Sequence, residues 1–199
     1  MADKNQPGLS QKIKMLSNKF TSSSMILNDS NTKTFVSYVS QNMRKASIDH
    51  QLLLLNSNRK LCFYTLFKTD TTKTDSLDAI KNPLHRTAIK KFRLGNHQLH
   101  IETGRHTVPK TPEKLRICTL CQSNGVENES HVLFSCALYN NFRSKFFDEI
   151  TGKYKFFKDL SINSKRLFLF NSIDPFICRS VAAFVFVVMN YRYQTLYHK

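Results

Sequence analysis

Tryptophan is absent from this sequence, and glycine and proline are scarce, at five residues each in a chain of 199. An all-β protein needs many tight turns, for which glycine and proline are favoured, so their scarcity favours helices. Hydrophobic residues nevertheless make up 41% of the chain and include sixteen phenylalanines. Because such a composition can form a packed core, it excludes a disordered chain and predicts a mainly α fold.

Acidic residues are also few: 14 stand against 30 lysines and arginines, which gives a formal net charge of +16. Such an excess creates a positive potential over the surface and attracts polyanions. The composition therefore predicts a polyanionic partner, either a nucleic acid or an anionic membrane surface.

Long apolar runs are missing as well. The longest, residues 181–189, has nine residues and is flanked by Arg179, Asn190 and Arg192, so it is too short and too polar to span a bilayer. The N-terminus has no apolar signal-peptide core, and an odd number of cysteines, five, does not suit a disulfide framework. We expect a soluble intracellular protein, nuclear or cytoplasmic, that is neither secreted nor inserted in a membrane.

Three of the five cysteines lie within nineteen residues, together with one histidine. Cys118, Cys121, His131 and Cys136 have the spacing C-x2-C-x9-H-x4-C, and three thiolates with one imidazole form a closed tetrahedral zinc site. The spacing predicts one structural Zn²⁺ in a zinc-knuckle-like loop of the CCHC type, residues 118–136. Four protein ligands leave no open position for a substrate, so we do not expect the metal to be catalytic.

Three other features of this region leave alternatives open. His100 or His106 could replace the predicted histidine ligand, and the cluster could be an accident of three buried thiols. Glu127 and Glu129 lie near the ligands in the sequence and could be taken for general bases. We expect them to orient the ligands or to face solvent, with Glu129 placed favourably at a helix N-terminus.

Hydrophobic periodicity predicts six or seven helices. In the first 80 residues an apolar stripe covers residues 13–20, and helices are expected over about residues 32–46 and 59–68. Periodicity does not decide the state of the apolar run 52–55, and the polar residues 69–75 are typical of a linker.

Capping residues mark the later helices. Asn82 and Pro83 begin a helix that should end at Gly95, and an amphipathic helix with apolar residues at every fourth position should end at Gly152. Further helices are expected over residues 163–170 and from Asp174 to about residue 197. The apolar positions of the amphipathic helix are Leu138, Phe142, Phe146 and Ile150.

These elements suggest two parts. Residues 1–80 form a helical segment with a frayed start, and residues 81–199 form a helical domain that contains the zinc loop. The loop lies between a basic helix segment and the amphipathic helix that follows it.

The basic segment immediately precedes the zinc loop. From Lys81 to Arg116 the sequence has nine lysines and arginines against two acids, a net charge of +7. In its helix an apolar stripe of Leu84, Ala88 and Phe92 faces away from Arg86, Lys90 and Arg93. A solvated basic surface is one interpretation. Phosphate contact is favoured here because the basic cluster adjoins a zinc module.

The same region resembles a known family. The residues R-x-C-x-x-C from Arg116 and E-x-E-x-H-x-L-F-x-C-x-x-Y from Glu127 resemble the zinc-binding C-terminal region of non-LTR (LINE-like) retrotransposon polyproteins, downstream of the reverse transcriptase. The similarity is clearest over residues 58–150. It implies the same four metal ligands, and it makes Arg105, Arg116 and Arg143 the family's basic positions. The implied function is binding of RNA or target DNA during target-primed reverse transcription, without catalysis by this piece.

The sequence also departs from a complete element. It has no polymerase aspartate pair and no RNase H-like acidic set. The carboxylates after the last ligand form no convincing endonuclease motif; they are Asp148, Glu149, Asp159 and Asp174. We expect a stand-alone fragment that is not an enzyme.

The first hypothesis is therefore a zinc-stabilised nucleic-acid-binding module that contacts RNA or DNA phosphates. The expected contacts are Arg86, Lys90, Arg93, Arg105, Arg116 and Arg143, with Tyr139 or His106 stacking on a base of a single strand. The alternatives are a protein-interaction module, favoured if Phe156, Phe157 and Phe168 are exposed together, and a degenerate endonuclease, which requires two or three of the late carboxylates to converge beside a lysine.

Overall fold

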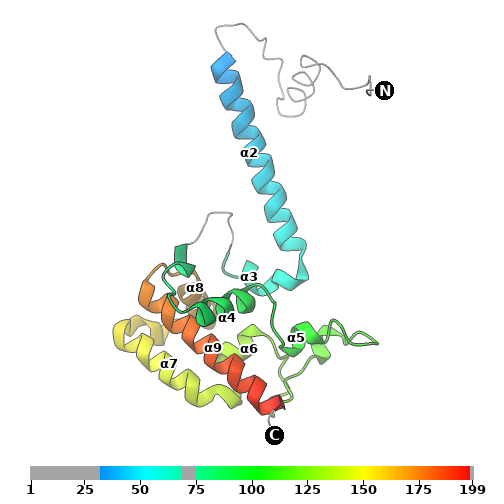
Figure 1. Cartoon of the computed structure of the whole chain (residues 1–199), viewed down its shortest axis with the longest axis vertical. Coiled ribbons are helices and arrows are strands. Elements are labelled where there is room, and N and C mark those ends of the chain that lie inside the picture. Colours follow the sequence, from blue (N-terminus) through cyan, green and yellow to red (C-terminus); the bar gives the residue numbers. More distant parts are fainter. Residues whose placement is uncertain (1–31, 69–74, 198–199) are drawn as a thin grey trace. The chain divides into compact units, whose positions relative to one another are not determined.

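The computed structural model describes residues 32–68 and 75–197, and α-helices dominate these residues (Figure 1). The mainly α fold is confirmed. The described residues form eight α-helices where the sequence predicts six or seven, because α5 and α6 have only four and six residues and are too short to show periodicity. The helices are α2 (Thr32–Ser57), α3 (Cys62–Thr65), α4 (Pro83–Arg93), α5 (His100–Thr103), α6 (Glu129–Phe134), α7 (Asn140–Lys153), α8 (Ile162–Asn171) and α9 (Pro175–Tyr197). The 3₁₀ turns are η2 (Arg59–Leu61), η3 (Asp75–Leu77), η4 (Glu113–Leu115), η5 (Ala137–Tyr139) and η6 (Lys155–Asp159).

The chain divides into two compact units, residues 1–54 and residues 55–199. The described part of the first unit is helical throughout and belongs to α2. This helix confirms the predicted one over residues 32–46 and continues through the undecided run 52–55. The stripe over residues 13–20 and nearly all of the linker 69–75 lie outside the described residues.

The second unit is organised around α9. This helix packs against α4, α7 and α8 and is surrounded by them in Figure 1. Its apolar residues cover more than one face, which suits a helix with neighbours on several sides. By length and composition α9 could cross a membrane, but half of its apolar stretch is buried inside the fold. The arrangement is compatible with a soluble protein.

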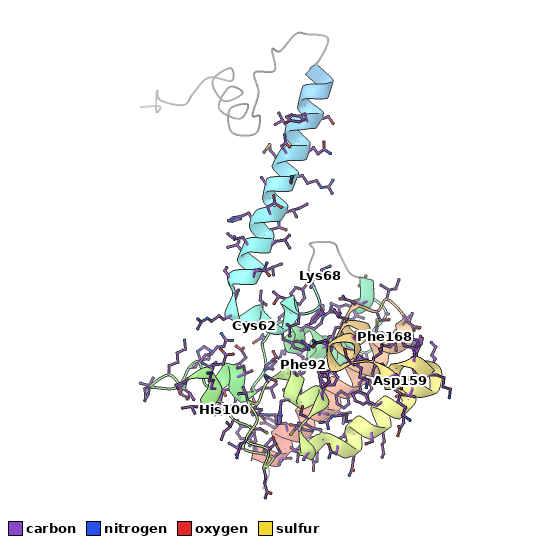
Figure 2. The ribbon with its side chains drawn as sticks, turned by 180° about the vertical axis from the view of Figure 1, so that it is seen from behind. Cys62, Lys68, Phe92, His100, Asp159 and Phe168 are labelled. Atoms are coloured by element: carbon purple, nitrogen blue, oxygen red, sulfur yellow. The ribbon has the colours of Figure 1, made fainter. Side chains whose placement is uncertain are left out.

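A cluster of phenylalanine rings joins α3 to α4 and α8. Phe63 packs edge-to-face against Phe67, Phe92 and Phe170, with ring centroids 5.5, 5.6 and 5.2 Å apart. Each edge-to-face pair adds about 0.5–1.5 kcal/mol to the stability gained from burial. Figure 2 shows Phe92 inside this unit. The predicted helix over residues 59–68 is thus a 3₁₀ turn and one short α-helix, fixed by packing.

Both ends of α4 agree with the sequence analysis. The side chain of Asn82 accepts hydrogen bonds from the backbone N–H groups of Leu84 and His85, at 2.9 and 3.4 Å. Gly95 has a φ of +61°, and a Cβ there would lie 2.5 Å from the carbonyl oxygen of Lys60. Glycine is therefore required at this position by both conformation and space.

The buried face of α4 is only partly the predicted one, because Phe92 is fully buried and Ala88 is partly buried against the core, but Leu84 is not. Leu84 is 61% exposed, whereas Ile89, Phe92 and Arg93 are buried. The three buried positions are spaced i, i+3 and i+4, so they share one face of the helix. The sequence places Arg93 on the opposite face because it follows Arg86 and Lys90 at the spacing i, i+4 and i+7.

The remaining helices follow the sequence analysis, with one correction. Phe146 and Ile150 of α7 are buried, as the four-residue repeat predicts. Gly152 does not end this helix, which continues to Lys153. A Cβ at Gly152 would meet no atom within 4 Å, and its φ is not positive, so no cap requires glycine there.

Asp174 begins α9 and provides a test of pH dependence. Its carboxylate accepts hydrogen bonds from the Tyr154 hydroxyl, the Phe176 backbone N–H and the Lys153 ammonium, and these lower its pKa to about 2. A lowered pKa stabilises the fold above the unfolded-state pKa, and this contribution is lost as the pH falls through the folded-state value. We expect Asp174→Asn to lower the urea midpoint at neutral pH, although asparagine can still cap the helix.

The difference between the variant and the wild type should shrink as the pH falls from about 4 to about 2. The exposed Asp159 is the matched control, and Asp159→Asn should leave the midpoint unchanged at every pH. A difference for Asp174→Asn that stays constant over this range would contradict the assignment.

Candidate metal centre

A short antiparallel pairing shapes the loop that carries the first two cysteines. The backbone N–H of Cys118 donates to the carbonyl of Gly125 at 2.8 Å, and that of Glu127 donates to the carbonyl of Arg116 at 2.9 Å. Between them Asn124 has a φ of +52°, a conformation that asparagine tolerates better than most residues. This tight loop lets the side chains of Cys118 and Cys121 reach the same cluster.

The short helix α6 presents the other two side chains. Asn128 caps it by accepting a hydrogen bond from the backbone N–H of His131 at 2.8 Å. Cys136 follows two residues after the helix, and its N–H donates to the carbonyl of His131 at 2.7 Å. The helix and this bond turn both side chains toward the cysteine loop.

The four predicted ligands converge. One ligand atom from each of Cys118, Cys121, His131 and Cys136 lies within 4.8 Å of all the others. The sulfurs of Cys118 and Cys136 are 4.0 Å apart, and Nε2 of His131 is 3.3 Å from the sulfur of Cys121. The group can hold a metal ion. Within residues 32–68 and 75–197 no second such group of His, Cys, Asp or Glu side chains is found.

The thiols differ in their protonation. Burial raises the pKa of Cys118, and it raises that of Cys136 to about 12. At Cys121 burial also acts upward, but hydrogen bonds from the Ser123 hydroxyl and backbone outweigh it and lower the pKa to about 6. Two of the three thiols would keep their protons at neutral pH without a cation. A bound metal would displace those protons. Its positive charge would compensate the negative charge of the thiolates, which burial otherwise disfavours.

The alternative histidine ligands do not join the cluster. Nδ1 of His100 lies 2.9 Å from the carbonyl oxygen of Ile117, and His106 is exposed outside the group. The ring of His131 instead lies against Gly125, where a Cβ would come within 3.1 Å of its Nδ1. A glycine therefore leaves room for the imidazole ring of this candidate ligand.

Arg143 fixes the end of α6. Its guanidinium donates to the carbonyls of Leu133, Val132 and Cys136 at 2.9, 3.3 and 2.6 Å. The last carbonyls of a helix have no partner within it, so a buried helix end needs such donors. Arg143 thus holds the backbone that presents His131 and Cys136.

Two further arginines act on backbone carbonyls in the same way. Arg116 donates to Ile101 at 2.7 Å and to Thr111 at 3.0 Å. Arg105 donates to Arg59 at 2.8 Å and to Ile101 at 3.3 Å. Together these bonds tie Arg59, Ile101 and Thr111 to the segment that precedes residues 118–136, which we call the metal loop.

The structure changes the interpretation of the predicted phosphate contacts. Arg93, Arg116 and Arg143 are only 6%, 4% and 8% exposed. Each donates to protein carbonyls, so none is placed to meet a phosphate at the surface. Arg86 is partly buried and donates twice to the carbonyl of Ile80. Among the six residues, Lys90 is exposed, whereas Arg105 has the same intermediate exposure as Arg86 and also forms an ion pair with Glu102 at 3.1 Å.

Sequence reasoning missed a buried ion pair. Glu127 is 2% exposed, and its two oxygens accept hydrogen bonds from Nε and Nη2 of Arg192, at 2.8 and 2.9 Å. One of these oxygens also accepts from the backbone N–H of His100 at 2.7 Å. Glu127 thereby connects the metal loop with α9 and α5. Glu129 is buried as well and pairs with His97 at 3.0 Å, so neither glutamate faces solvent.

The aromatic predictions are also revised. Tyr139 is 1% exposed and cannot stack on a base from solvent. Phe156 is 52% exposed and Phe168 is partly buried, but Phe157 is 1% exposed, so the three rings are not exposed together.

The late carboxylates do not converge. Asp174 caps α9, Glu149 accepts a hydrogen bond from the Ser180 hydroxyl at 3.1 Å, and Asp159 lies at the edge of the unit (Figure 2). No group of three of them gathers in the described part of the chain.

The fold and this Cys₃His centre define a mainly helical protein with a candidate metal site. Comparisons with protein-family models, curated proteins and solved structures find no match to the chain.

Proposed function

We propose that this protein is a zinc-stabilised nucleic-acid-binding module without catalysis of its own. The observation that carries the proposal is the convergence of three cysteine sulfurs and one imidazole nitrogen, in a loop that the sequence places directly after exposed lysines. The resemblance to the zinc-binding region of retrotransposon polyproteins supports the same function. Free cysteines suit a reducing compartment, nuclear or cytoplasmic.

Zinc fits the donors better than other common ions. A Zn–S distance of about 2.3 Å in a tetrahedral site places two sulfurs about 3.8 Å apart, close to the 4.0 Å between Cys118 and Cys136. Thiolate and imidazole ligands suit zinc, whereas magnesium and calcium need oxygen ligands. With four protein ligands the ion would act as a structural staple.

The structure suggests a different set of phosphate contacts, which we call the basic loop surface: Arg59, Lys60, Arg105, Lys110 and Lys114. All except the partly exposed Arg105 are exposed. Arg59 and Lys60 belong to η2, and the other three residues follow α5. The hydrogen bond from Arg105 to the carbonyl of Arg59 joins these two segments. The backbone N–H of Thr111 donates to the carbonyl of Gly104 at 3.1 Å and holds the loop that carries the lysines. These cations would attract phosphates, with Lys90 as a further exposed contact.

Binding to mixed-sequence RNA or DNA of about 20 nucleotides should weaken steeply with salt, because each phosphate contact releases counterions. Replacing Lys110 and Lys114 by serine should weaken binding and reduce the salt slope by about 1.5, at about 0.7–0.9 for each lost contact. Fluorescence anisotropy over a salt series measures both. Lys155→Ser/Lys158→Ser removes the same charge from η6 and should leave the slope closer to that of the wild type. A flat salt response in the wild type would refute the proposal.

A further inference from the structure

A groove of about 610 Å³ lies between α7 and α9 and reaches the start of α4. The two long helices lie side by side in Figure 1. The floor of the groove is apolar and includes Phe142, Phe146, Phe184 and Val187. Val187 is 40% exposed, so part of this floor is open to solvent. A groove between two packed helices is a common binding site for a third helix.

The rim of the groove is mostly positive. Lys81, Lys145 and Arg179 line it, with Glu149 as the acid among the lining residues. Within the described chain neither Lys81 nor Lys145 forms an ion pair. Glu149 accepts a hydrogen bond from the Ser180 hydroxyl. An apolar floor between unpaired cations is complementary to a ligand that is apolar on one side and acidic on the other.

The rings of the floor are not arranged for nucleic acid. Single strands bind by stacking bases on free aromatic faces. Here the rings of Phe146 and Phe184 stack on each other with centroids 4.5 Å apart, and both are 5% exposed. Phe142 packs against Tyr191 at 5.1 Å. A second copy of this chain is also a poor occupant, because its net charge of +16 repeats the sign of the rim.

We propose that this groove binds an acidic amphipathic helix of a partner protein. Leucine or phenylalanine side chains of that helix, at positions i, i+3 or i+4 and i+7, would lie on the phenylalanine floor. Glutamates and aspartates flanking them would face Lys81, Lys145 and Arg179. This site lies apart in sequence from the basic loop surface, so the protein could bind nucleic acid and a protein partner through different residues.

The test uses the full-length, zinc-loaded protein and a fluorescein-labelled peptide of about 18 residues, about 27 Å long as a helix. The peptide carries leucine at every third or fourth position and glutamate at most others, and a scrambled peptide has the same composition. At physiological ionic strength the amphipathic peptide should bind at least about tenfold more tightly than the scrambled one, since only the former presents one apolar face.

Two groove variants and one control assign the site. Lys145→Glu/Arg179→Glu should weaken peptide binding by about tenfold or more, and Val187→Glu should weaken it without changing the rim. Lys155→Glu/Lys158→Glu makes the same change of net charge outside the groove and should leave binding within about twofold. Circular dichroism confirms that each variant is folded.

If the scrambled peptide binds as tightly as the amphipathic one, simple charge attraction explains the binding and the proposal is overturned. The same holds if Lys155→Glu/Lys158→Glu weakens peptide binding as much as Lys145→Glu/Arg179→Glu. An RNA or DNA strand that displaces the peptide and itself loses affinity in Lys145→Glu/Arg179→Glu would assign the groove to nucleic acid, which also overturns it. The serine variants of Lys110 and Lys114 should bind the peptide normally, so failure of this proposal is distinguishable from failure of the nucleic-acid proposal.

Discussion

Replacing Cys136 by serine should abolish metal binding and unfold the region around the metal loop. Cys136 is fully buried and is one of the four candidate ligands. Residues 119–125 are exposed or partly exposed, so they have little apolar burial to hold them without the ion. Structural zinc contributes an apparent binding free energy of about 10–16 kcal/mol in small zinc modules, comparable to the whole stability of a domain. Native mass spectrometry should find one zinc per wild-type chain and none in the variant.

The matched control is Cys62→Ser. Cys62 is an exposed cysteine outside the cluster, so this variant should keep the ion and the melting temperature of the wild type. A chelator should reproduce the effect of Cys136→Ser on the wild-type protein, and added zinc should reverse it. A wild-type chain purified without metal that neither binds zinc nor melts higher in its presence would remove the basis of the functional proposal.

Features encoded by neighbouring residues could be predicted from the sequence. The Asn82 cap, the turn at Gly95 and the C-x2-C pair each depend on atoms within a few residues, so their spacing carries the information. The convergence of His131 with the cysteines also follows from a short loop and one helix turn. Gly152 shows the limit of this reasoning, because a glycine near the end of a periodic pattern need not be its cap.

The role of the arginines could not be predicted in the same way. Arg93 donates to the carbonyl of Phe170, which is 77 residues away, and Arg143 to carbonyls at the end of a different helix. Backbone carbonyls are present at every position, so the sequence does not identify the one that accepts. A basic run therefore suggests a phosphate-binding surface, although several of its cations hold the fold together. One available signal was the spacing of Arg93, four residues after the apolar Ile89 on a core-facing helix.

The buried pair of Glu127 and Arg192 should be among the most sensitive points of the fold. The two residues are 65 positions apart, and their side chains are 2% and 7% exposed. Burial alone would lower the pKa of Arg192, but the hydrogen bonds and charge of Glu127 outweigh it and raise that pKa. Removing one partner leaves the other as a buried, uncompensated charge. We expect Glu127→Gln and Arg192→Met each to lower the free energy of unfolding by about 3–5 kcal/mol.

Urea denaturation of both single variants and the double variant separates a specific pair from general damage to the core. Because the double variant leaves no unpaired charge, its loss should be smaller than the sum of the single losses by about 2–3 kcal/mol. Glu113→Gln changes an exposed glutamate of η4 and should alter the free energy of unfolding by less than about 0.5 kcal/mol. Additive losses in the double variant would mean that the two charges do not stabilise each other, and the connection between the metal loop and α9 would then depend on apolar packing alone.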